Sequence, residues 1–144
     1  MSIITDQLYL GSQEDAFSSE FMSQEPTAVL NVAANVPMTP HAVVEYLHLP
    51  MYDNGTQDLL SFIPPAIDFI DRNRKRGVRV LVHCLAGISR SASIVIAYLM
   101  QTQRLGFSEA HAVVKKQRSV TDPGMWFVYK LFAYESVLNP PNPE

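Results

Sequence analysis

One stretch in the middle of the chain restricts the fold more than any other, because it places the only cysteine between two strongly patterned segments. Residues 78–82 form a short β-branched and apolar run that predicts a buried strand. Residues 91–100 are almost wholly apolar and predict a mostly buried helix. Cys84 therefore lies in a tight loop that joins the end of a strand to the start of a helix.

This loop has the chemistry of an anion site, since the first N–H groups of a helix lack partners and carry the positive end of its dipole. If the loop curls with its amides inward, it forms a nest for a tetrahedral phosphoryl group, and Arg90 adds a planar fork of donors. The same surroundings favour the thiolate form of Cys84, which is then a nucleophile beneath the bound group. Gly87 permits the turn where a Cβ would crowd the ligand.

The loop resembles the signature of the cysteine-dependent phosphatases, and it is most similar to that of the small, atypical dual-specificity protein phosphatases. The matching positions are His83, Cys84, Gly87, Ser89, Arg90 and Ser91. The likeness extends over residues 4–138 and includes Leu8-Tyr9-Leu10-Gly11-Ser12, which is similar to the opening strand of the family. Without this context, Cys84 would be interpreted as a small buried hydrophobic residue.

The fold expected here is an α/β domain of the protein tyrosine phosphatase type, with a central, mostly parallel twisted sheet flanked by helices. The expected site lies at the carboxyl end of the strand before Cys84. We expect one catalytic domain, residues 1–138, and a proline-rich tail, residues 139–144. The resemblance implies hydrolysis of phosphotyrosine and phosphoserine or phosphothreonine through a phosphocysteine intermediate. The implied phosphate-binding residues are Leu85, Ala86, Gly87, Ile88, Ser89 and Arg90.

Asp53 is the candidate general acid, because cleavage of a phosphate ester requires a proton on the departing oxygen. In the family, an aspartate that follows a strand ending in proline fills this role, and the resemblance places it on Asp53. The sequence Asp53-Asn54-Gly55 is also a combination that turns favour in any protein. Asp58 is the second candidate for the acid.

His83 and Ser91 flank the loop at its two ends. In the family, the histidine supports the loop and tunes the cysteine, whereas a lone histidine beside a strand is more often a core residue with one hydrogen bond. Ser91 is either the N-cap of the following helix or a hydroxyl that steadies the leaving thiolate. Both roles are compatible with one position.

The rest of the chain predicts further strands and helices around the loop. Apolar runs predict strands at residues 3–5, 8–11, 28–32 and 43–49. Helical spacing predicts helices at residues 12–17 and 59–76 and two more that begin near residues 108 and 122. Ser12 is expected to cap the first helix, and Asn31 is expected to be a buried polar residue that ties loops together.

Two features near the ends of predicted helices have alternative interpretations. The basic run Arg72, Arg74, Lys75 and Arg76 suits the negative end of a helix dipole, or it is a substrate-docking patch. Asp122 and Pro123 are expected to start the last helix as N-cap and first residue. Its apolar row is expected to be core: Trp126, Phe127, Leu131, Tyr134 and Leu138.

This last region departs from the family pattern at three places. The chain has Arg118-Ser119, Pro123-Gly124 and Lys130-Leu131 where the family commonly has Arg-Pro, Pro-Asn and Gln-Leu. These changes leave the nucleophile, the arginine and the acid untouched. They concern the support behind the active-site loop.

Composition excludes several classes of protein. The 144 residues carry a formal net charge of −3, so nucleic acid and anionic membranes are not expected partners. We expect no secretory signal, no membrane span, and no metal site or cofactor, because no cluster has metal-ligand spacing. One cysteine suits a reducing compartment, the cytoplasm with or without the nucleus. A monomer or weak homodimer is expected.

Phosphorylated proteins are the first expected substrates. Leu85, Ala86, Ile88 and Ser89 are uncharged, whereas phosphoinositide-directed relatives tend to place lysines at such positions. A lipid, glycan or RNA 5′-end phosphatase is the alternative enzyme. A module that captures phosphorylated partners without turnover is the alternative outside enzymes.

Overall fold

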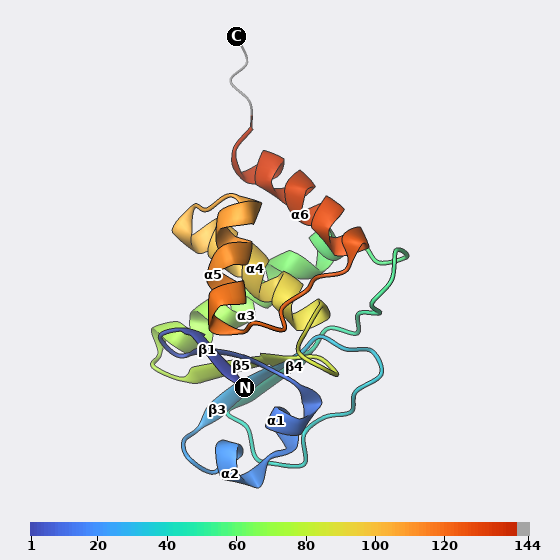
Figure 1. Cartoon of the computed structure of the whole chain (residues 1–144). Coiled ribbons are helices and arrows are strands. Elements are labelled where there is room, and N and C mark those ends of the chain that lie inside the picture. The colour runs from blue at the N-terminus through green and yellow to red at the C-terminus, as the bar shows by residue number, and fades with distance from the viewer. Residues whose placement is uncertain (141–144) are drawn as a thin grey trace.

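A five-stranded sheet organises the molecule, and the computed structural model describes residues 1–140 (Figure 1). The strand order is β1-β2-β5-β3-β4. The strands are β1 (Ser2–Thr5), β2 (Leu8–Gly11), β3 (Thr27–Asn31), β4 (Glu45–His48) and β5 (Arg79–His83). Only the β1–β2 pair is antiparallel, which confirms the predicted mostly parallel sheet. The strand that leads to Cys84, β5, is central.

Helices cover both faces of this sheet. They are α1 (Gln13–Phe17), α2 (Ser19–Met22), α3 (Leu59–Lys75), α4 (Arg90–Gln103), α5 (Phe107–Gln117) and α6 (Met125–Leu138). Figure 1 shows α3 to α6 gathered on one side of the sheet and α1 and α2 on the other. The four-residue helix α2 was not predicted, because one turn carries no periodic signal. Within residues 1–140, no helix combines the length and the apolar character that crossing a bilayer requires.

The central strand supplies both layers of the core. Val80 and Val82 belong to the large apolar cluster formed with α3 to α6, whereas Leu81 belongs to the smaller one with α1 and α2. Successive side chains of a strand point to opposite faces, so a strand buried on both sides consists of continuous apolar residues. This double burial fixes the position of the residue that follows the strand.

Two predicted details are confirmed and one is wrong. Ser12 caps α1 by accepting the N–H of Asp15, and Asn31 donates to the carbonyl of Val36 and accepts the N–H of Ala33. The last helix does not begin at Asp122 and Pro123: its N-cap is Gly124 and its first residue is Met125. The N–H of Asp122 instead donates to the carbonyl of Ile88 at 2.8 Å, which keeps this segment out of the helix. Of the predicted tail, residues 141–144 lie outside the described part.

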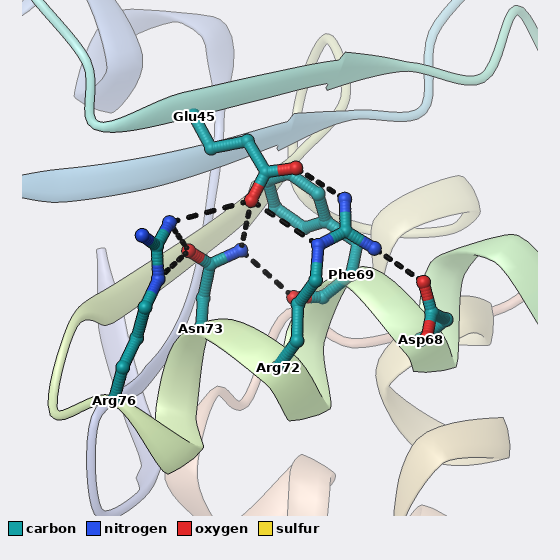
Figure 2. Close-up of polar contacts among 6 residues, drawn as sticks. All are labelled: Glu45, Asp68, Phe69, Arg72, Asn73 and Arg76. Atoms are coloured by element: carbon teal, nitrogen blue, oxygen red, sulfur yellow. Dashed lines mark hydrogen bonds and ion pairs between the residues drawn. The ribbon is translucent and has the colours of Figure 1, made fainter.

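The basic run at the end of α3 binds groups within the fold. Figure 2 shows Glu45 of β4 contacted by Arg72 and Asn73 of α3 and by Arg76, the C-cap residue of that helix. Hydrogen bonding from Arg72 lowers the pKa of Glu45. Arg74 donates to the hydroxyl of Tyr98 in α4 at 2.8 Å. These contacts fasten the edge strand to α3 and α3 to α4.

Candidate active site

The loop between β5 and α4, residues 84–89, is held from outside through its carbonyl groups. Four successive carbonyls accept hydrogen bonds: Leu85 from the N–H of Gln13 (2.9 Å), Ala86 and Gly87 from Arg118 Nη2 and Nε (3.3 and 2.7 Å), and Ile88 from the N–H of Asp122 (2.8 Å). The N–H of a trans peptide points opposite to its carbonyl. Turning the carbonyls outward therefore aims the amides inward, as an anion nest requires.

Cys84 lies at the bottom of this loop and is 3% exposed. The N–H of Gly87 donates to its Sγ at 3.3 Å, and the hydroxyl oxygen of the buried Ser91 lies 3.1 Å from the same sulfur. Both groups can donate to a sulfur that carries negative charge. Cys84 is thus buried in the fold, yet it faces a pocket and two donors rather than apolar packing alone.

Gly87 makes the tight curve of the loop possible. Its φ is +69°, a left-handed conformation that side chains rarely adopt. A Cβ at this position would also lie 2.5 Å from the carbonyl oxygen of Gly11. Both the backbone angle and the close approach of β2 therefore require glycine.

The guanidinium of Arg90 lies at the wall of the pocket and is 8% exposed. Its Nη1 donates to the side-chain oxygen of Asn35 at 2.7 Å and to the carbonyl of Met51 at 3.0 Å. Since both bonds use the same nitrogen, they fix the plane of the group and leave Nε and Nη2 for an anion. No sequence pattern indicated Asn35 for this role, because it belongs to a loop far from Arg90 in the chain.

Asp53 lies at the mouth of a pocket of about 360 Å³ whose floor is Cys84. Its Oδ1 accepts two hydrogen bonds of 2.9 Å, one from the hydroxyl of Ser89 and one from the indole N–H of Trp126. Asp58, the second candidate acid, stands at the N-cap position of α3 and does not line this pocket. The structure thus places Asp53, and not Asp58, in the pocket that Cys84 also lines.

His83 is completely buried behind the loop. Its Nδ1–H donates to the carbonyl of Cys84 at 3.1 Å, and its Nε2 is buried without a partner within the described residues. Burial lowers the pKa of this imidazole, which favours the neutral ring. A neutral ring with one bond to the loop supports the backbone next to Cys84.

Comparison with known proteins shows the family to which this chain belongs. A family model described as "Dual specificity phosphatase, catalytic domain" matches residues 8–137. The chain belongs to the dual-specificity phosphatase family. Membership in this family confirms the resemblance and the predicted fold.

Relatives of the phosphatase domain include both curated sequences and solved structures. Human dual specificity protein phosphatase 5 is 42% identical over 140 residues, which are 95% of this chain and 36% of that protein. The chain thus spans about a third of that relative. Human DUSP28 superposes with a TM-score of 0.90 at 30% identity, covering 96% of this chain and 97% of that one. The human tyrosine phosphatase-like serine/threonine/tyrosine-interacting protein superposes with a TM-score of 0.86 at 32% identity, covering 95% and 96%.

Besides Asn35, two further residues of the site were not found by sequence reasoning. Trp126 was expected in the core, which is wrong: it is 40% exposed, lines the pocket and binds Asp53. Arg118 was noted as part of a departure from the family pattern, yet it donates to two carbonyls of the loop. Phe127 and Leu131 of the same apolar row are buried as expected.

Proposed function

We propose that this domain hydrolyses phosphotyrosine and phosphoserine or phosphothreonine in proteins by two displacements at phosphorus. In the first, the thiolate of Cys84 attacks phosphorus while the bond to the leaving oxygen breaks, and Asp53 gives its proton to that oxygen. The product is a phosphocysteine and a free hydroxyl on the protein substrate.

The second displacement regenerates the enzyme. Water attacks phosphorus, the carboxylate of Asp53 takes a proton from that water, and the sulfur–phosphorus bond breaks. The hydroxyl of Ser91, 3.1 Å from Sγ, donates to the departing thiolate. Inorganic phosphate leaves the pocket.

Binding of the phosphoryl oxygens falls to the loop and Arg90 in both steps. The proposed donors are the backbone N–H groups of residues 85–90 together with Nε and Nη2 of Arg90. His83 has a positioning role through the carbonyl of Cys84. The observation that carries the proposal is the sulfur of Cys84, facing the N–H of Gly87 and a pocket that Asp53 and Arg90 also line.

The proposal is tested by phosphate release from an aryl phosphate with purified protein. Cys84→Ser should remove turnover, and Arg90→Lys should reduce kcat/KM by about 10²–10³-fold, because a point charge cannot replace two positioned donors. Asp53→Ala should retain the phosphocysteine step for activated esters and trap phosphopeptide substrates. Turnover by Cys84→Ser equal to that of the wild type would show that the assignment is wrong.

The rim of the pocket supports phosphoproteins as substrates. The exposed side chains of Leu85 and Ile88 are apolar, and the carboxylates of Asp53 and Asp122 also line the pocket. A headgroup with several phosphates would meet repulsion from these carboxylates. A panel of phosphopeptides, phosphoinositides, phosphoglycans and RNA 5′ ends tests this choice, and a preference for any non-protein ester would contradict it.

A binding module is the second candidate function, since one structural relative is named as a phosphatase-like interacting protein. Measuring phosphopeptide affinity and phosphate release on the same sample separates the two. Tight binding with no release would favour the module. The proposed compartments are the cytoplasm and nucleus, because a single buried thiol suits a reducing environment. The proposed assembly is a monomer or weak homodimer, which light scattering over a concentration series tests.

A further inference from the structure

The indole of Trp126 connects α6 to the acid loop, residues 52–56, which carries Asp53. Trp126 is the second residue of α6, and its indole N–H donates to Oδ1 of Asp53 at 2.9 Å. The hydroxyl of Ser89 donates to the same oxygen, also at 2.9 Å. Two donors on one carboxylate oxygen leave the other oxygen, Oδ2, as the atom that can carry the proton toward the pocket.

The acid loop needs such a support, because residues 52–56 are exposed and belong to no helix or strand. Its internal bonds are local: Asn54 accepts the N–H of Thr56 at 2.9 Å, and Gln57 accepts the N–H of Tyr52 at 3.1 Å. A Cβ on Gly55 would lie 3.9 Å from the Cβ of Trp126, so the loop also packs against this residue.

Gly124 explains how the indole reaches this place. A Cβ at position 124 would lie 2.5 Å from Cε2 and 2.6 Å from Nε1 of Trp126. The backbone at Gly124, with φ −56° and ψ 149°, is one that any residue adopts, so the requirement for glycine comes from the indole alone. The asparagine that the family pattern commonly has here would collide with the ring in its present position.

We propose that the indole of Trp126 positions Asp53 as general acid, and that Gly124 makes this possible because it has no side chain where the indole lies. The two residues thus form a coupled pair. Trp126 is a positioning residue, since it acts through the carboxylate. Ser89 links the pair to the phosphate loop, residues 84–89, because its hydroxyl also accepts the N–H of Gly124 at 2.8 Å. This inference rests on the proposed function of Asp53 and adds a residue to it.

The test uses two aryl phosphates that differ in how much their leaving group needs a proton. An ester of an acidic phenol departs without help, whereas phenyl phosphate depends on the general acid. Trp126→Phe keeps a ring and removes the donor, so we expect kcat/KM for phenyl phosphate to fall about tenfold while the activated ester changes little. Gly124→Ala should reproduce this selective loss, and Met125→Ala, a change at a neighbouring exposed side chain, should not.

Coupling is measured in a double-mutant cycle. If both changes act by releasing the carboxylate, Gly124→Ala and Trp126→Phe together should lose no more than either alone, and neither should lower the phenyl phosphate rate further in Asp53→Ala. Equal slowing of both esters, or no slowing, would overturn the inference. Slowing by Asp53→Ala but not by Trp126→Phe overturns this inference alone, whereas an unselective Asp53→Ala overturns the acid assigned above.

A second readout needs no catalysis. Trp126 is the only tryptophan of the chain, so its fluorescence reports on this contact. Asp53→Ala and Gly124→Ala should each change the emission, and Asp58→Ala, which removes a carboxylate elsewhere in the same loop region, should leave it unchanged. An emission insensitive to Asp53→Ala would contradict the contact itself.

Discussion

Alanine substitutions at two glycines separate backbone strain from the close contact that shapes the phosphate loop. Gly87 and Gly77 both have positive φ, +69° and +75°. A Cβ on Gly77 meets nothing within 4 Å, whereas a Cβ on Gly87 lies 2.5 Å from the carbonyl oxygen of Gly11. Alanine at either site therefore has the cost of a left-handed backbone, and only alanine at position 87 also overlaps neighbouring atoms.

The expected magnitudes follow from these geometries. A left-handed alanine costs about 1–2 kcal/mol, and the less flexible unfolded chain returns about 0.4–1 kcal/mol of this at both sites. Overlap with backbone atoms that cannot rotate away adds about 1–3 kcal/mol at Gly87 only. Gly87→Ala should therefore lower the free energy of unfolding by about 1–3 kcal/mol more than Gly77→Ala does.

Urea unfolding measures the two stabilities, and release of phosphate from an aryl ester measures activity. Gly87→Ala should also reduce kcat/KM by about 10²-fold, since displaced amides no longer meet the equatorial oxygens. Gly77→Ala should keep wild-type kcat/KM. Equal destabilisation by both changes, or an active Gly87→Ala, would refute the reasoning.

Three further outcomes are expected. Ser91→Ala should slow release of the phosphocysteine more than its formation, seen as a burst of phenol in stopped flow with kcat reduced about tenfold; an unchanged kcat would contradict the role of the hydroxyl. Glu45→Gln should lower the free energy of unfolding by about 1 kcal/mol, measured in urea, because Arg72 and Arg76 lose the charge of one carboxylate partner. Since the pKa of Glu45 is lowered, this stability is present above its unfolded pKa and is lost as pH falls through the folded value. A variant as stable as wild type at pH 7 would exclude the contribution. Burial lowers the pKa of His83, so below about pH 6.5 the unfolded chain binds the proton more readily than the folded protein, and the free energy of unfolding falls as pH drops toward the folded pKa. His83→Gln should flatten that decline between about pH 6.5 and 5. An identical slope in the variant would contradict the buried neutral ring.

Sequence was sufficient for the sheet and for the loop at its centre. The apolar run before Cys84 and the apolar helix after it identify β5 and α4, because both are buried on all sides and carry long unbroken signals. Ser12 and Asn31 were also correctly interpreted, since caps and buried amides follow local rules. Local rules are therefore enough where the partners are close in the chain.

The residues that position the site were not predicted, because their hydrogen-bond partners are distant in the sequence. The periodicity around Trp126 indicates an apolar row, but only the folded chain shows that this ring faces a loop many residues earlier. The same holds for Arg118, the C-cap residue of α5, whose partners Ala86 and Gly87 lie about thirty residues earlier in the chain. Asp122 and Pro123 have the residue types of a helix start, yet a bond from Asp122 to the phosphate loop prevails over local preference.

The hydrogen bonds that turn the carbonyls of the phosphate loop outward have a consequence for synthesis on the ribosome. The nucleophile, its arginine, β5 and α4 all emerge before Arg118 and Asp122, the residues that turn three of the loop carbonyls away from the pocket. A nascent chain that has reached α4 therefore carries its reactive sulfur without a fixed anion cradle. On the proposed mechanism, we therefore expect the loop to become competent only after synthesis of the segment that joins α5 to α6, later than the sheet itself.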